Sequence, residues 1–130
     1  MTSKLVMCAA SALASCILTG CATPNSLRAD GPVLEETTSL PARQVAGCIG
    51  DKLQAWPESS QQIPILATRL TETGYSISGS ATLPGLWGAG GTDTVVLVDI
   101  DDLKTKTRVR LYTHFVMGGG VIVKMVRSCL

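Results

Sequence analysis

Residues 94–100 read TVVLVDI, the most apolar strand-like segment of the chain. Valine, isoleucine and threonine favour strands because a side chain branched at Cβ packs well on a pleated sheet. The residues that follow, Asp101-Asp102-Leu103-Lys104, are polar enough to turn the chain. We therefore expect residues 94–100 to form a strand at the centre of a sheet.

The neighbouring segments alternate between two kinds of side chain, with the period of two that is typical of half-buried strands. Residues 75–83 place apolar or small side chains on one face and hydroxyl side chains on the other. Residues 105–115 alternate in the same way, with the inward positions Val109, Leu111, Thr113 and Phe115. Residues 65–70 predict a further strand, and a turn at Gly74 joins it to residues 75–83 as a hairpin.

Two outer segments have helical features. Residues 40–56 follow Ser39, which can cap a helix, carry Pro41 in the first turn and stop at Pro57. Residues 121–130 fit a helix face, although their branched side chains would also suit a strand. We interpret them as a helix because their polar residues share one side only in that conformation: Lys124, Arg127 and Ser128.

The order of elements is therefore α-β-β-β-β-α, with connections short enough for hairpins. This order predicts an α+β fold built as a two-layer sandwich. We expect an antiparallel sheet of about four strands with one or two helices on one face.

The amino terminus has the organisation of an export signal. Lys4 is the only charged residue before an uncharged apolar run at residues 5–18. A signal-peptide core has about 7–15 residues, whereas a membrane-spanning helix needs about 20. The run ends on Leu18-Thr19-Gly20-Cys21, which resembles the bacterial lipobox.

The resemblance to a lipobox implies cleavage before Cys21 and attachment of lipid to its thiol. Residues 1–20 would then be a signal peptide, 21–39 a lipidated cysteine with a flexible tether, and 40–130 a single domain. The tether is expected because the segment is polar, contains two prolines and has no sustained period. An ordinary cleaved signal followed by a free cysteine is the alternative.

The five cysteines divide into three groups. Cys8 and Cys16 leave with the signal, and Cys21 carries the lipid. In the oxidising compartment outside the cytoplasm, the two that remain usually pair, which predicts a Cys48–Cys129 disulfide. A metal site is disfavoured, since two cysteines and a single histidine are a poor ligand set.

The chain is similar to a loose group of small proteobacterial lipoproteins. The shared features are the lipobox, a tether, Val45-Ala46-Gly47-Cys48-Ile49 in a helix, alternating strands and a terminal Cys129-Leu130. The resemblance covers nearly the whole chain through short motifs, supports the Cys48–Cys129 pairing and implies no activity. Ala22, rather than Asp, after the lipidated cysteine resembles a signal for the outer membrane, on its periplasmic side or at the cell surface.

Two features are candidate binding surfaces. Lys106, Arg108 and Arg110 point outward from one strand, followed by Tyr112, and could meet anionic lipid, lipopolysaccharide or an acidic protein. The alternative is a solvated strand face whose cations prevent edge pairing. Trp87, in a glycine-rich loop, could anchor a partner or fold back onto the core.

Other groups do not assemble a recognisable reaction centre. The cluster Asp99, Asp101 and Asp102 lacks the continuation of a calcium loop and reads as a polar turn beside Lys104 and Lys106. The glycine loops lack the Lys-Ser/Thr of a phosphate loop, and His114 has no identifiable nucleophile or orienting acid. We expect no catalytic residues, no cofactor and no metal.

The functional hypothesis is a lipid-anchored, non-enzymatic module of the cell envelope that binds another macromolecule. Lys and Arg number 11 against 10 Asp and Glu, and Lys4 leaves with the signal, so the near-neutral mature chain gives no reason to expect nucleic acid binding. One alternative is a small periplasmic hydrolase or ligand carrier that uses His114 with Asp99 or a pocket under the glycine loop. Another is a structural surface lipoprotein with no fixed partner.

Overall fold

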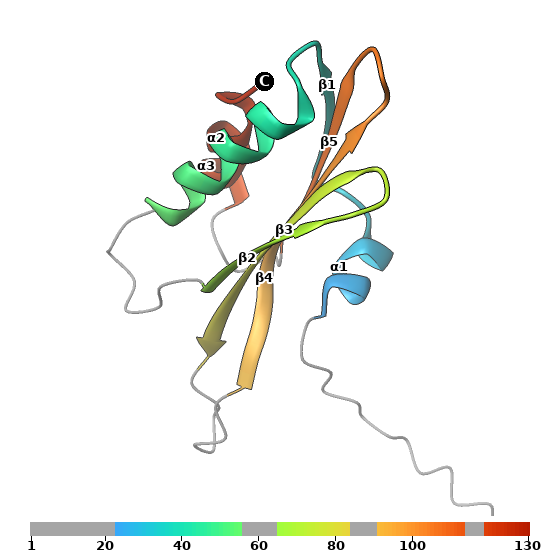
Figure 1. The fold of residues 1–130 in the computed structure, drawn as a ribbon. Helices are drawn as coiled ribbons and strands as arrows, with labels where there is room; N and C mark the ends of the chain where they lie inside the picture. Colours follow the sequence, from blue (N-terminus) through green and yellow to red (C-terminus); the bar gives the residue numbers. More distant parts are fainter. Residues whose placement is uncertain (1–22, 56–64, 84–90, 114–118) are drawn as a thin grey trace, which may run out of the picture.

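The structure, a computed structural model, describes residues 23–55, 65–83, 91–113 and 119–130. These residues form one antiparallel sheet with helices on both of its faces (Figure 1). Helices α2 (Ala42–Gln54) and α3 (Gly119–Arg127) lie side by side on one face, and the short α1 (Pro24–Asp30) lies on the other. The prediction of an α+β fold with an antiparallel sheet is confirmed.

The sheet has five strands in the order β1-β5-β4-β3-β2, with every neighbouring pair antiparallel. Their bounds are Leu34–Thr38 for β1, Ile65–Leu70 for β2, Gly74–Leu83 for β3, Gly91–Asp102 for β4 and Thr107–Thr113 for β5. The apolar run at residues 94–100 lies within β4, which is the central strand as predicted. The sheet gains its fifth strand from β1, which the sequence did not suggest.

The main core lies between the sheet and the layer of α2 and α3. Alternate residues of β4 and β5 supply Val98, Ile100, Val109 and Leu111, each fully buried. The helices contribute apolar residues at helical spacing: Val45, Ile49 and Leu53 from α2, and Ile122 and Val126 from α3. The helical interpretation of the carboxyl-terminal segment is therefore confirmed.

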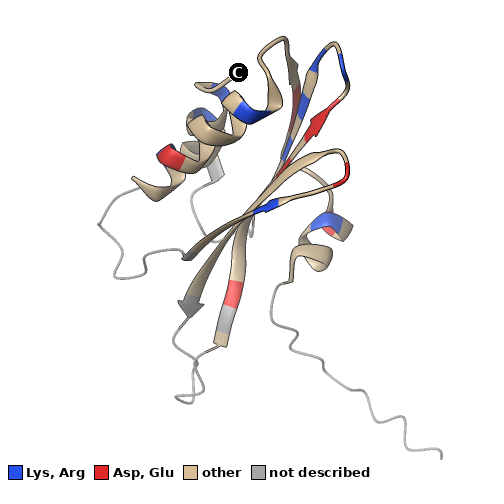
Figure 2. Ribbon diagram, viewed as in Figure 1, with Lys and Arg blue, Asp and Glu red and all other residues tan. Residues whose placement is uncertain are grey.

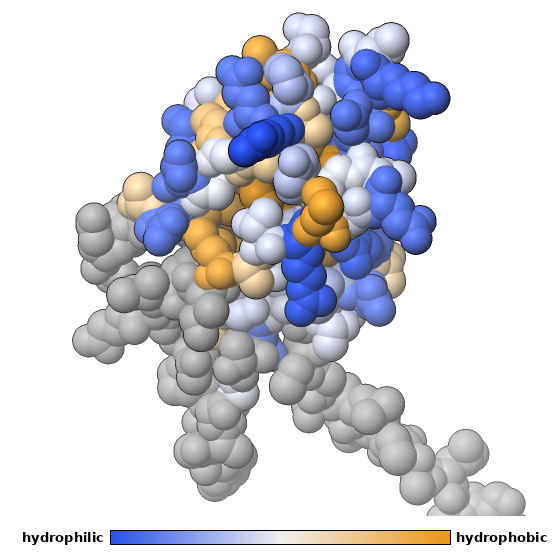
Figure 3. Space-filling model, viewed as in Figure 1, coloured by the Kyte–Doolittle hydropathy of each residue, from blue (hydrophilic) through white to orange (hydrophobic). Residues whose placement is uncertain are grey.

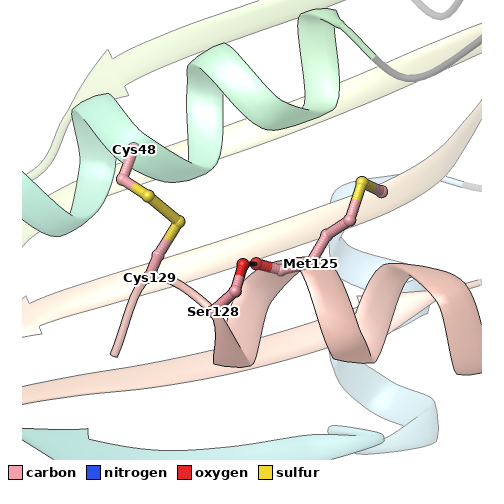
Figure 4. Close-up of a disulfide and its surroundings, with 4 residues drawn as sticks. All are labelled: Cys48, Met125, Ser128 and Cys129. Carbon is pink, nitrogen blue, oxygen red and sulfur yellow. Dashed lines mark hydrogen bonds between the residues drawn. A yellow bond between two sulfur atoms is a disulfide. The ribbon is translucent and has the colours of Figure 1, made fainter.

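The disulfide between Cys48 and Cys129 joins α2 to the short segment that follows α3 (Figure 4). The two Cα atoms are 5.8 Å apart. The bond fixes the last turn of the chain against the middle of α2, so it closes the helical layer. The predicted pairing is present.

The β2–β3 turn depends on a residue without a side chain. A Cβ on Gly74 would overlap the backbone carbonyl of Ile100 on β4. At the same corner, the backbone N–H of Asp102 donates to the carbonyl oxygen of Thr73 at 2.7 Å. Glycine therefore lets the hairpin pass close to the central strand.

The prediction of a flexible tether over residues 21–39 is wrong for the part that the structure describes. The hydroxyl of Thr23 accepts a hydrogen bond from the backbone N–H of Ser26, whose hydroxyl accepts one from the N–H of Thr23, and this capping box starts α1. Residues 34–38 then pair with β5. Polar composition and two prolines concealed a helix whose stability comes from tertiary contacts.

The predicted helix over residues 40–56 is also shorter at both ends. It runs from Ala42 to Gln54, and its N-cap is Pro41 rather than Ser39, without a capping side chain. The hydroxyl of Thr107 on β5 donates to the backbone carbonyl of Leu40, just before the helix, at 2.7 Å. This contact fixes the chain just before the helix, while the helix itself begins without a side-chain cap.

Leu27 holds α1 on the sheet. It is buried against Leu97 of β4 and Tyr112 of β5, in a small cluster on the face opposite the main core. We expect Leu27→Ala to lower the free energy of unfolding by about 2 kcal/mol, because it removes most of the apolar contact of α1. Urea unfolding measures the change, and hydrogen exchange should show α1 opening first.

A matched control for this prediction is Val33→Ala, because Val33 is 53% exposed just after α1. Its expected cost is within about 0.5 kcal/mol. Equal, small effects of the two substitutions would show that α1 does not contribute to the stability of the domain.

Candidate functional site

The sheet face beneath α1 is polar at its centre. The guanidinium of Arg28 donates from Nε to Asp99 Oδ2 at 2.7 Å and from Nη2 to Oδ1 at 2.8 Å. The hydroxyl of Ser76 donates to Asp99 Oδ1 at 2.9 Å. Such a two-point pairing of arginine with carboxylate fixes direction as well as distance. Arg28 therefore locks α1 onto β4 in one orientation.

Burial by itself raises the pKa of Asp99, which is only 7% exposed. The hydrogen bonds from Arg28 and Ser76, together with the charges of Arg28 and Arg110, outweigh the burial and lower the pKa below its ordinary value. Asp99 is thus a charged, fully engaged acceptor at neutral pH.

Asp101 is the second buried carboxylate on this face. Its Oδ1 accepts from the hydroxyl of Thr73 at 2.8 Å. Its Oδ2 accepts from Arg108 Nη2 at 3.0 Å and from Arg110 Nη2 at 2.8 Å. Burial raises the pKa of Asp101, but these hydrogen bonds and the two arginine charges leave it lowered.

These contacts correct the predicted basic surface. Arg108 and Arg110 lie on the face opposite α2 and α3, as expected, but both are paired with Asp101. Tyr112 is not exposed: it is 3% accessible beneath α1, and burial raises the pKa of its hydroxyl. Lys106 is exposed in the turn between β4 and β5. The four residues therefore do not form one free cationic stripe.

The reason lies in the register of β4 with β5. Asp99 is paired across the strands with Arg110, and Asp101 with Arg108. Because opposite charges on neighbouring strands attract, Asp101 pairs with its facing residue Arg108 and with the diagonal Arg110. Asp99 pairs instead with Arg28 of α1. Among the described residues, no group of three or more His, Cys, Asp or Glu side chains is placed to hold a metal ion.

A groove lies between α1 and the strands β2, β3 and β4, with a volume of about 590 Å³. Hydroxyl side chains form much of its wall: Thr71, Ser76, Ser78, Ser80 and Thr94. Thr23, the cap of α1, lies at its rim. Arg28 and Arg69 are its charged lining residues, so the groove has cationic side chains and no carboxylate on its surface.

The two arginines differ in what they contact. Arg28 is engaged by Asp99, and its side chain remains 38% exposed. Arg69, on the edge strand β2, is exposed and has no carboxylate partner among the residues that the structure describes. Figure 2 shows cationic residues on both α1 and β2, the elements that flank the groove. Arg69 is thus the cation of the groove that is available to a ligand.

Several predicted candidates lie outside the described residues. These are the lipidation residue Cys21, the loop residue Trp87, the lone histidine His114 and the larger part of the glycine-rich loop at residues 84–93. Residues 91–93 of that loop belong to β4, and Gly119 and Gly120 of the second begin α3. On the surface shown in Figure 3, hydrophobic side chains are scattered among hydrophilic ones rather than gathered into one broad patch. That face gives no sign of a large apolar docking surface.

The chemistry of the groove is that of hydrogen-bond donation. Hydroxyl and guanidinium groups can donate to the oxygens of an anionic or polar ligand. The carboxylate nearest the serine hydroxyls is Asp99, whose lowered pKa makes it a weak base at neutral pH. The described residues therefore suit binding better than proton transfer.

No protein-family model matches the chain, and neither a curated protein nor a solved structure is similar enough to count as a match. Fold alone does not specify a function, so any assignment must come from the site and the sequence. None of the described helices is both long and apolar enough to cross a membrane.

Proposed function

We propose that the protein is a lipid-anchored, non-enzymatic module of the cell envelope that binds another envelope macromolecule or anionic lipid, with the groove beside α1 as its binding site. The groove is the observation that carries the binding role. It combines an available arginine, a row of hydroxyls and a wall without carboxylates, next to the start of the described domain. A volume of about 590 Å³ also lies within the range of roughly 300–1,000 Å³ that is common for ligand sites.

Two features support export and anchoring. Residues 5–18 and the sequence Leu18-Thr19-Gly20-Cys21 have the order of a lipoprotein signal. The Cys48–Cys129 disulfide is the kind of crosslink that persists outside the reducing cytoplasm. A lipidated Cys21 would hold the domain at a membrane. The resemblance of Ala22, after that cysteine, to an outer-membrane sorting signal makes the outer membrane the proposed destination.

A soluble-ligand carrier is the second candidate, because the groove is also of a size for a small polar molecule. A carrier must release its ligand into solution, whereas an anchored binder works at the membrane. Loss of the anchor should therefore abolish the function of the module and leave that of a carrier intact.

The anchor is tested by Cys21→Ser in the full chain, followed by separation of membranes and soluble extract. We expect the wild-type protein in the membrane fraction, with residues 1–20 removed and lipid attached. The variant should accumulate as an unlipidated precursor that retains those residues, since the thiol that takes the lipid is gone. Stable anchoring needs two or more acyl chains, so no partial retention of a cleaved form is expected.

The matched control is Cys16→Ser, which changes a cysteine of the same segment that no lipid is proposed to occupy. It should be processed and anchored like the wild type. A Cys21→Ser protein that is cut and still retained in the membrane would rule out the lipid anchor.

A further inference from the structure

We propose that the groove beside α1 faces the bilayer and binds the phosphate headgroups of anionic phospholipids in the membrane that carries the protein. This inference rests on the proposed lipid anchor at Cys21. It names the partner of the same groove and the orientation of the domain on the membrane.

Very little chain separates the proposed anchor from the fold. Thr23 is fixed by its capping box and lines the groove. Only two peptide units separate Cys21 from Thr23, so their Cα atoms are at most about 7 Å apart. A tether extending to residue 39 would have allowed roughly 60 Å. The anchor therefore keeps the rim of the groove at the membrane surface.

The charge of the groove suits an anionic surface. The wall of the groove contains Arg28 and Arg69 and no acidic residue. Asp99 neutralises Arg28 from below, which leaves the charge of Arg69 without a carboxylate partner among the described residues. Elsewhere on the same sheet face, Arg108 and Arg110 share the single carboxylate of Asp101. The groove thus presents an arginine with no carboxylate partner among the described residues, where the anionic surface would lie.

The rest of the groove wall carries hydrogen-bond donors. Ser78 and Ser80 project from β3 into the groove beside Thr94 of β4. Hydroxyls and a guanidinium together can donate several hydrogen bonds to the oxygens of one phosphate group. Apolar lining is limited and would not hold an acyl chain alone. The headgroup, rather than the hydrocarbon, is therefore the part of the lipid that fits.

The experiment uses the mature lipidated protein, reconstituted in vesicles and followed by amide hydrogen exchange. One set of vesicles is phosphatidylcholine alone, and the other has equal parts of phosphatidylcholine and phosphatidylglycerol. We expect exchange in α1 and β2 to be about fivefold slower with phosphatidylglycerol, the effect of one cation meeting an anionic surface. Exchange in α2 and α3 should be the same in both sets.

Arg69→Gln should remove this dependence on phosphatidylglycerol, because it deletes the available cation and leaves the Arg28–Asp99 pair in place. Arg43→Gln is the matched control. It changes an exposed arginine of α2 that does not line the groove, and it should leave the dependence intact. A dependence that survives Arg69→Gln would overturn the assignment of the groove.

The possible failures are distinguishable. A protein that does not stay with either kind of vesicle would refute the anchor and therefore the proposed function. A protein that is anchored in both, with equal exchange of α1 and β2, would refute headgroup binding alone. Inorganic phosphate added to phosphatidylcholine vesicles should give no protection; protection equal to that from phosphatidylglycerol would assign the groove to a soluble anion instead.

Discussion

Replacing both Cys48 and Cys129 by serine is expected to lower the free energy of unfolding by about 4.5 kcal/mol. The disulfide joins residues 81 apart in sequence, so it closes a loop that includes most of the domain. In the chain-entropy account, such a crosslink destabilises the unfolded chain by restricting its conformations. Urea unfolding of the wild type and the double variant measures the difference.

Reduction of the wild-type protein is the control for this prediction. Dithiothreitol should move its unfolding midpoint towards that of the double variant and leave the midpoint of the variant unchanged. A loss of this size is a large part of the stability of a small domain. Coincident midpoints of the oxidised wild type and the double variant would show that the disulfide does not stabilise the fold.

Asp101→Asn is expected to lower the free energy of unfolding by about 2–3 kcal/mol. The substitution keeps the shape of the side chain but removes the charge that Arg108 and Arg110 share. Because both arginines are about one-third exposed, water compensates for part of the loss, and the cost falls below that of a fully buried pair. Urea unfolding at neutral pH checks the value.

Asp102→Asn is the matched control, since Asp102 is exposed and its side chain accepts the backbone N–H of Lys104 at 2.8 Å. An asparagine can accept the same hydrogen bond, so its cost should stay within about 0.5 kcal/mol. Equal effects of the two substitutions would contradict the special role of Asp101.

Acid should unfold the protein for the same reason. The pKa values of Asp99 and Asp101 are lowered from 3.8, so their contribution is fully present above that pH and is lost as the pH falls through the folded-state values. The wild type should therefore lose stability below about pH 4, and Asp101→Asn should lose less over that range. Parallel pH profiles of the two proteins would contradict this account.

The features that could be predicted from sequence are those with a local pattern. The continuous apolar run at residues 94–100 predicted the central strand. The alternation of apolar and hydroxyl side chains at residues 75–83 predicted β3. The helical spacing of the carboxyl-terminal residues outweighed their branched side chains. The disulfide followed from the cysteine inventory, because few cysteines remained to be paired.

The features that could not be predicted depend on contacts distant in sequence. Residues 24–38 look like a linker in isolation, since α1 needs the cluster with Leu97 and Tyr112, and β1 needs the edge of β5. The Asp101 pairs could have been foreseen: a hairpin turning at residues 103–106 places residue 101 opposite 108. The strand register was therefore the information needed to predict that these arginines are paired rather than free.

The groove has some residues that a local sequence pattern predicts and others that only long-range contacts bring together. Its serines were visible as the hydroxyl face of residues 75–83, which could be identified from alternation. Its cations come from α1 and β2, which no sequence period connects with β3. Only the fold shows that Arg69 and the serines share one wall.

The central claim is that Cys21 carries lipid and holds the groove at a membrane. The most direct measurement is the intact mass of the mature protein purified from its own membrane, with fragmentation of the amino-terminal peptide. We expect a chain that begins at residue 21, with the mass of a diacylglyceryl thioether on Cys21. A chain that retains residues 1–20, or that begins with an unmodified Cys21 thiol, would contradict the claim.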